Sequence, residues 1–274
     1  MPMVRAMRLL NAIEAGTTSG AQLETLLTTD PGRLAEWNVL LGMRGQSARL
    51  FSSATATASL IASATALGAL TSSITGMRNV SNNAQAMAAV AASSTAMAAV
   101  IASSTAMAAV IASSTAMAAV AASSTAMAAV AASSTAMAAV AASSTAKMAI
   151  YAADTAITEI AGSATALAAI RAAAGYSILA TASVSVSRAW PGVAGGKYLI
   201  VGVSTSDSST AATITVSTRR TGSTRPATNT TASDNVTLTT ALGPICCPCE
   251  EAFTVTTTDG STQIIYLGAL RCDV

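Results

Sequence analysis

Few residues in this chain have the types and spacing that acid–base or metal chemistry needs. The chain has no histidine, the commonest general base and metal ligand. Asp154 and Glu159 are the only acids near the middle of the chain, and the side chains of Glu250 and Glu251 would point to opposite faces of a strand. We interpret both pairs as solvated, and no serine lies in a Gly-x-Ser-x-Gly motif. We therefore predict no catalytic residue and no cofactor.

The cysteines are the one reactive group with an informative spacing. Cys246, Cys247 and Cys249 form a Cys-Cys-Pro-Cys run, and Cys272 follows further along the chain. The Cys-x-x-Cys spacing could hold zinc, but a zinc site would have to use all four thiols because there is no histidine to complete it. The four cysteines could instead form disulfides in an oxidising environment or remain free thiols. We favour disulfides and predict no metal.

A ten-residue repeat fills the middle of the chain. Its unit is (Ala/Ile)-Ala-Ser-Ser-Thr-Ala-Met-Ala-Ala-Val, as in Ile101 to Val110. About twelve exact or diverged copies run from residue 51 to 170. Fixed apolar positions in a repeat are expected to form its core. The predicted core residues are Met87, Val90, Met97, Val100, Met107, Val110, Met117, Val120, Met127, Val130, Met137 and Val140.

The repeat is expected to be helical, because alanine and methionine are strong helix formers. A period of ten leaves the Met–Val stripe about 80° short of whole turns, so a continuous helix needs a tight left-handed supercoil. Alternatively, each copy is a short helix broken at the serines, which are good N-caps, and the copies stack as a solenoid. A β-helix is the third alternative. We favour a bundled helical rod, with broken helices next.

The flanking segments differ from the repeat. Three short helices are predicted before it, with Gly16 ending the first, Ala21–Leu27 forming the second and Arg33–Arg44 the third. After residue 175, alternating and β-branched residues predict an antiparallel β-sandwich. Its expected strands are Ile178–Val186, Lys197–Ser204, Ala211–Thr218, Asn235–Thr240, Phe253–Thr257 and Gln263–Leu267. The predicted fold is thus an elongated α+β chain: a helical docking domain (1–50), a repeat shaft (51–172) and a β domain (173–274).

Composition limits the classes of partner. Charged residues make up 9% of the chain and the net charge is +2, which gives no reason to expect nucleic acid. Every apolar window long enough to span a bilayer contains several Ser and Thr residues, so membrane insertion is not expected. The first residues form an amphipathic helix rather than a secretion signal, and we expect the chain to be made and kept in a cytoplasm.

Two stretches and the repeat carry a resemblance. Arg8 to Thr18, Gly32 to Leu41 and the repeated S-x-T-A-M-A-A-V resemble structural proteins of tailed bacteriophages, usually called head, neck (collar) or tail fibre proteins. The likeness covers residues 1 to about 170. It implies a virion protein, assembled in the host cytoplasm as a homo-oligomer, with a trimer expected, and anchored at one end. It brings no catalytic residue.

Three functional hypotheses follow. The first is a fibre-like virion appendage whose N-terminal segment docks to other virion proteins and whose C-terminal domain caps it or contacts a host-surface receptor. The second is a bacterial surface adhesin with a repeat stalk, which should carry a secretion signal or anchor. The third is an enzyme acting on surface polysaccharide, which would want paired carboxylates and aromatic platforms. The first is favoured.

Overall fold

A computed structural model describes residues 2–184, 187–190, 197–205, 212–218, 227–233, 247–249, 253–257 and 263–273. The chain divides into two compact units, Met1–Val130 and Ala131–Val274, which are described separately. The described helices are α1 (Pro2–Glu14), α2 (Gly20–Thr29), α3 (Pro31–Gly42), α4 (Arg44–Ser52), α5 (Ala54–Ile61), α6 (Ala64–Ser72), α7 (Ile74–Ser81), α8 (Ala84–Ala92), α9 (Ser94–Ala102), α10 (Ser104–Ile111), α11 (Ser114–Ala122), α12 (Ser124–Ala132), α13 (Ser134–Ala142), α14 (Ser144–Ala152), α15 (Asp154–Ala161) and α16 (Ala164–Arg171).

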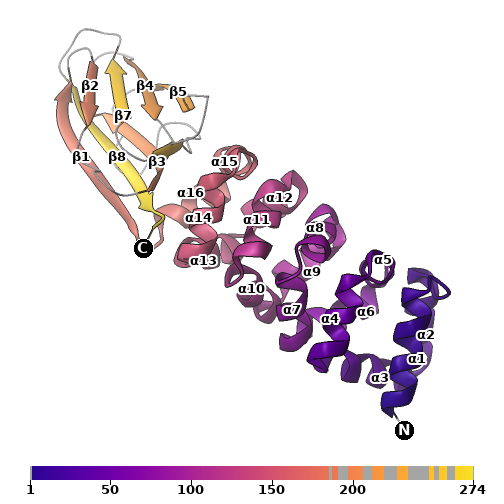
Figure 1. The fold of residues 1–274 in the computed structure, drawn as a ribbon. Helices are drawn as coiled ribbons and strands as arrows, with labels where there is room; N and C mark the ends of the chain where they lie inside the picture. Colours follow the sequence, from indigo (N-terminus) through magenta and orange to yellow (C-terminus); the bar gives the residue numbers. More distant parts are fainter. Residues whose placement is uncertain are drawn as a thin grey trace. The chain divides into compact units, whose positions relative to one another are not determined.

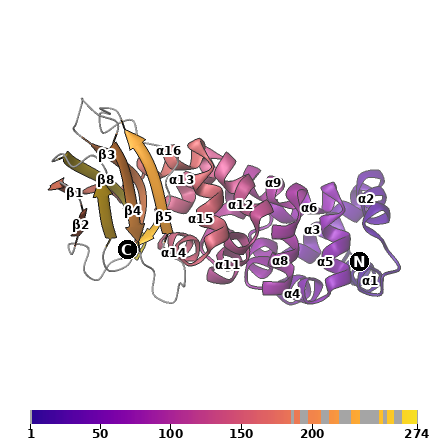
Figure 2. The same cartoon turned by 90° about the horizontal axis from the view of Figure 1, so that it is seen from above.

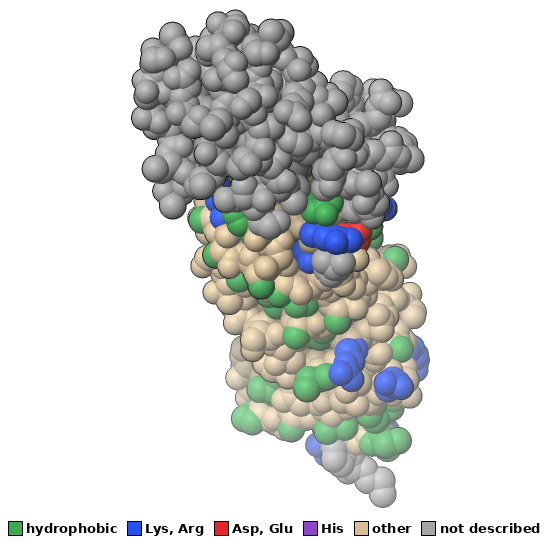
Figure 3. Space-filling model, turned by 90° about the vertical axis from the view of Figure 1, so that its left-hand side faces the viewer, with side chains coloured by type: hydrophobic (Ala, Val, Ile, Leu, Met, Phe, Trp, Pro, Cys, Tyr) green, Lys and Arg blue, Asp and Glu red, His purple; other side chains and the backbone are tan. Residues whose placement is uncertain are grey.

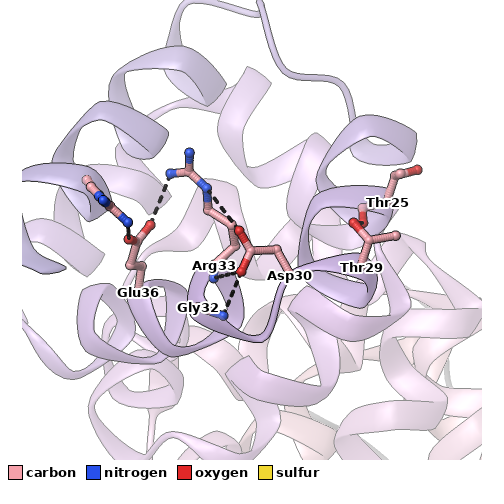
Figure 4. A network of polar contacts seen from close by, with 7 residues as sticks. Thr25, Thr29, Asp30, Gly32, Arg33 and Glu36 are labelled. Carbon is pink, nitrogen blue, oxygen red and sulfur yellow. Dashed lines mark hydrogen bonds and ion pairs between the residues drawn. The ribbon is translucent and has the colours of Figure 1, made fainter.

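The first three helices pack together and cover the start of the repeat. α1 contacts α3, and α2 contacts α3, α5 and α6. Gly16 has a φ of +71°, a conformation that glycine adopts readily, and the chain turns there after α1. The Oδ1 atom of Asp30 accepts hydrogen bonds from the backbone N–H of Gly32 (2.8 Å) and Arg33 (3.4 Å), which caps α3 (Figure 4). The sequence therefore placed these helices correctly, within a few residues at each end.

Two side chains join the N-terminal helices α2 and α3 to the repeat. The indole N–H of Trp37 donates to the backbone oxygen of Ala66 at 3.3 Å, in a buried contact between α3 and α6. The Glu24 carboxylate accepts from the Ser63 hydroxyl at 2.6 Å, and from the backbone N–H and hydroxyl of Thr65 at 2.9 and 2.7 Å. The bond from Ser63, followed by those from Thr65, lowers the pKa of Glu24. The hydrogen bonds to the ionised Glu24 carboxylate therefore stabilise the folded chain at neutral pH. This stabilisation is lost as the pH falls through the lowered pKa.

The repeat is a series of short helices, each of eight or nine residues from α4 to α16. One residue with extended backbone commonly separates consecutive helices, as at Ser93 (φ −100°, ψ 114°), which is the C-cap of α8 and the N-cap of α9. The chain bends by 100° between α5 and α6, by 100° between α8 and α9, and by 98° between α10 and α11. Three such bends nearly complete a full turn, so the chain returns over itself after three helices.

Stacking of every third helix follows from these bends. In the first unit the most extensive helix contacts within the repeat join α4 to α7, α7 to α10, and α8 to α11. Figures 1 and 2 show this order, and α11, α8 and α5 follow one another in a row in Figure 2. In the second unit α13 and α16 are stacked in the same way. Each coil of the solenoid therefore contains three helices and three repeats.

The favoured bundled rod of continuous helix is wrong for this segment, and so is the β-helix; the broken-helix solenoid is what the chain forms. The ten-residue period is compatible with the solenoid because the Met–Val stripe need not continue from one helix to the next. The repeating geometry also begins at α4, ahead of the predicted start at residue 51. Among the described residues no single helix is long and apolar enough to cross a membrane, and four bent pairs of helices reach that length and apolarity only when both members are counted.

The second unit continues into two four-stranded antiparallel sheets, in the orders β1-β8-β3-β6 and β2-β7-β4-β5. The Arg171 side chain at the end of α16 donates to the backbone oxygen of Val201 in β3, at 2.9 Å for its shorter bond. The strands are β1 (Tyr176–Val184), β2 (Ser187–Trp190), β3 (Tyr198–Thr205), β4 (Ala212–Thr218), β5 (Ala227–Ser233), β6 (Cys247–Cys249), β7 (Phe253–Thr257) and β8 (Gln263–Arg271).

Five of the predicted strands are found in these sheets, with shifted ends. The strands β2, β5 and β6 were not predicted, because β2 and β6 are short and β5 is mostly Thr, Asn and Ala. The predicted strand Asn235–Thr240 lies outside the described residues.

Candidate functional site

The inner face of the solenoid contains the predicted core residues. All twelve Met and Val side chains at the two fixed repeat positions are buried, with Met107, at 6% exposed, the most accessible of them. The alanine before each Met, such as Ala96 or Ala116, is buried as well. In α11 the residues on either side of this face, Ser114, Ala118 and Ala122, are exposed. Each repeat thus contributes one narrow apolar face to a core that the chain forms with its own neighbouring coils.

In several copies the serine at the third repeat position makes two hydrogen bonds at once. In α11 the Oγ of Ser113 accepts from the backbone N–H of Ala116 at 3.2 Å and caps the helix, while its hydroxyl donates to the backbone oxygen of Ser81 at 2.7 Å. Ser81 lies 32 residues earlier, at the end of a helix in the preceding coil. The same pair of bonds recurs at Ser103, Ser123 and Ser163, each time to an oxygen 32 residues earlier and at 2.7 Å.

This arrangement satisfies groups that short helices leave free. Every α-helix has N–H groups at its start and C=O groups at its end without partners inside the helix. Because the repeat has a helix end every ten residues, these groups are unusually frequent here. One hydroxyl serves an N–H of its own helix and a C=O of the coil before, and it therefore joins neighbouring coils. The sequence pattern indicated the cap but not the second bond.

The outer surface of the repeat carries almost no charge. No Asp or Glu occurs between Glu36 and Asp154, and the face seen in Figure 3 is mostly uncharged, with a few basic and acidic side chains. The exposed positions of the regular repeat are Ala, Ser and Thr. Between α5 and α13 the described surface therefore offers contact area and hydroxyl groups but no carboxylate.

Lys147 departs from the repeat because it occupies the position of the core methionine. Its side chain is 5% exposed. It lines a cavity of about 930 Å³ together with alanines of α13 and α16 and the segment that ends at Gly175. A Cβ atom on Gly175 would lie 4.0 Å from the Lys147 Nζ. A long aliphatic stem can fill the place of methionine while its ammonium group reaches a more polar site.

Of the four cysteines, the structure describes the side chain of Cys272 alone. Cys272 is a free, fully buried thiol, and burial raises its pKa to about 12 despite the opposing effect of the Lys147 ammonium. A thiol of this kind stays protonated at neutral pH and is a poor nucleophile. Cys247 and Cys249 lie in β6, whose side chains are outside the described residues, and so does Cys246.

The sheet order bears on one of the possible cysteine pairings. β6 and β8 lie on opposite sides of β3, where Tyr198 is paired with Cys249 on one side and with Arg271 on the other. Two strand spacings separate their Cα atoms by about 9–10 Å, whereas a disulfide needs Cα atoms within about 7 Å. This sheet order is therefore incompatible with a bond between Cys249 and Cys272 of one chain.

The described residues contain no group of three or more acidic, cysteine or histidine side chains that could hold a metal ion. Comparison of the sequence with known protein families and with curated proteins finds no match. The candidate functional feature of the described residues is the solenoid itself, with its serine bonds between coils and its largely uncharged surface.

We predict that Ser113→Ala destabilises the solenoid. The change removes an N-cap, which costs about 1 kcal/mol, and leaves the Ser81 oxygen without its partner, which costs about 1–3 kcal/mol. Urea unfolding followed by circular dichroism measures the loss. Ser114→Ala is the matched control, because Ser114 is the exposed neighbour within the same repeat. Equal stability of the two variants would contradict the proposed role of the serine.

A second prediction concerns the core. Met117→Asp places a carboxylate at a position that is 0% exposed, and the free energy of unfolding should fall by several kcal/mol, on the order of 4. Ala118→Asp, on the exposed face of the same helix, should change it by less than about 0.5 kcal/mol. The same urea titration distinguishes them. A tolerant Met117 together with a sensitive Ala118 would reverse the assignment of the two faces.

Proposed function

We propose that the chain is a non-enzymatic structural protein of a tailed-phage virion and forms a fibre-like appendage of the head, neck or tail. The N-terminal helices would dock to other virion proteins, and the C-terminal β region would cap the appendage or contact a host-surface receptor. The observation that carries the proposal is the near-identical helical repeat, in which stacked coils are joined by the same serine bond at Ser103, Ser113 and Ser123. Repeats of this kind suit a spacer whose length changes by duplication.

Two finer features belong to the same proposal. We infer that the two antiparallel sheets face each other as the β-sandwich expected from the sequence. We also infer a homotrimer, on the resemblance alone. The Met–Val stripe gives no reason for self-association, because the chain buries that stripe in its own coils.

Labelling of phage particles that carry this chain tests the function. An antibody against residues 173–274 should decorate a projecting appendage in negative-stain images, whereas an antibody against residues 1–50 should label only detergent-dissociated particles because docking covers that segment. Particles from a host in which the gene is disrupted are the control. Purified virions that lack the chain would overturn the proposal.

The spacer role predicts which deletions are tolerated. Removing residues 94–123 deletes α9, α10 and α11, one complete coil, and joins Ser93 to the start of α12. The helical signal per residue should be kept, and the repeat should lose one layer of helices, about 8–10 Å. Removing residues 94–108 should unfold the repeat locally, because Met117 then falls at the exposed second position and Thr115 at the buried tenth position. Circular dichroism and small-angle X-ray scattering compare the two, and equal tolerance would refute the three-helix coil.

A further inference from the structure

Comparison of the diverged copies with the regular repeat shows which residues differ from those that the repeat normally has at the same position. Among the diverged copies, α4 and α7 carry arginine or asparagine where the regular copies have small residues. Arg44 stands where the regular repeat has Ser94 or Ser104, and Arg78 stands where it has an exposed alanine. Asn79 and Asn82 also replace alanines of the regular unit. None of these substitutions is at a core position.

The fold brings all four residues to one place. α4 and α7 are stacked in adjacent coils. Arg44, Thr75, Arg78, Asn79 and Asn82 line a pocket of about 310 Å³. This volume is at the lower end of the range for small-ligand sites, about 300–1,000 Å³.

The asparagines hold the pocket in shape and leave specific groups for a ligand. The Asn79 Nδ2 donates to the backbone oxygen of Arg44 at 2.9 Å and to the Ser47 Oγ at 2.5 Å, which fixes the start of α4 against α7. Both amide hydrogens are then used, and its Oδ1 is left as an acceptor. The Asn82 Oδ1 lies 3.3 Å from the Ser113 hydroxyl and shares its single proton with the Ser81 oxygen, which leaves the Asn82 N–H groups as donors.

The charge of the pocket has no counterpart in the surrounding fold. Both arginine side chains are exposed, and no Asp or Glu occurs between Glu36 and Asp154. By contrast, Arg33 and Arg49 in the same unit are paired with Glu36 and Glu14. Two guanidinium groups at one site repel each other, and an anion placed between them removes this cost. The start of α4, which has no side-chain cap, adds further positive potential.

The neighbouring surface extends the site. A second pocket of about 430 Å³ shares Arg78 and Asn82 and includes Thr105, Ser113 and Ile74, whose side chain is 57% exposed. Hydroxyl and amide groups beside an exposed apolar side chain suit a ligand that has its own hydroxyls and a less polar face.

We propose that the pocket between α4 and α7 binds an oxyanion, the carboxylate or phosphate group of a small hydroxylated ligand such as a sugar acid or a sugar phosphate. The two arginines contact the oxyanion, Asn82 donates to it or to a hydroxyl, and the free Asn79 oxygen accepts from a hydroxyl. This site does not depend on the proposed virion role of the chain.

Isothermal titration of the full chain with glucuronate, glucose 6-phosphate, inorganic phosphate and glucose tests the proposal. Glucuronate binding without phosphate binding identifies a carboxylate site, and the reverse identifies a phosphate site. Binding of either should weaken as the salt concentration rises. Glucose, which has no charge, should bind at least about tenfold more weakly than the charged probes. Equal binding of glucose, or no binding of any anion, would overturn the proposal.

Two variants restore the residues of the regular repeat and should therefore fold. Arg44→Ser and Arg78→Ala should each weaken anion binding about tenfold or more. Arg8→Ala removes the same charge from an exposed position on α1 outside the pocket and should leave the affinity unchanged. Circular dichroism checks that each variant keeps the wild-type helical signal. Unchanged affinity in both pocket variants, or an equal loss in Arg8→Ala, would show that the pocket is not the binding site.

Discussion

The hydroxyl group of one serine per repeat connects the local structure of this chain to its tertiary structure. A helix of eight or nine residues is too short to be stable alone in water, where isolated helices need about 12–15 residues. The serine caps a helix and bonds to the coil before, as Ser113 does with Ala116 and Ser81. Without the bend at this residue the Met–Val faces would not meet, and without those faces the short helices would have no core.

Alanine has a different role from the one that its helix propensity suggests. Ala96 or Ala116, beside the core methionine, is buried with no exposed surface, and its small side chain allows coils to approach closely. Each coil buries little apolar area compared with a helix rich in leucine, at about 25 cal/mol per Å². Stability must therefore come from many equivalent interfaces added together, as in other repeat proteins, with α1–α3 closing one end.

The sequence predicted the elements better than their arrangement. Helix for the repeat, burial of Met and Val, and the three N-terminal helices all follow from propensity and spacing. The three-helix coil does not, because it depends on a bend of about 100° at one extended residue, as between α8 and α9, and a period of ten does not encode that angle. The bond from Ser113 to Ser81 spans 32 residues and has no signal in local sequence. For the same reason sequence spacing could not show that β3 separates Cys249 from Cys272.

A regular repeat also separates structural from functional constraint within a single chain. Substitutions at the third, sixth, seventh and tenth positions change the cap or the core, so these positions are held by folding. The exposed second, fourth and eighth positions and the half-buried ninth position carry Ala or Ser only because nothing more is required there, and a larger or charged residue costs the fold little. Arg44, Arg78, Asn79 and Asn82 all lie at such positions, yet they gather around one pocket although they belong to helices in two different coils. Scattered drift would place them around the solenoid without regard to its stacking. Asn79 also joins α4 to α7, whereas the convergence of the two exposed arginines across coils is better explained by a shared ligand than by tolerance of the fold.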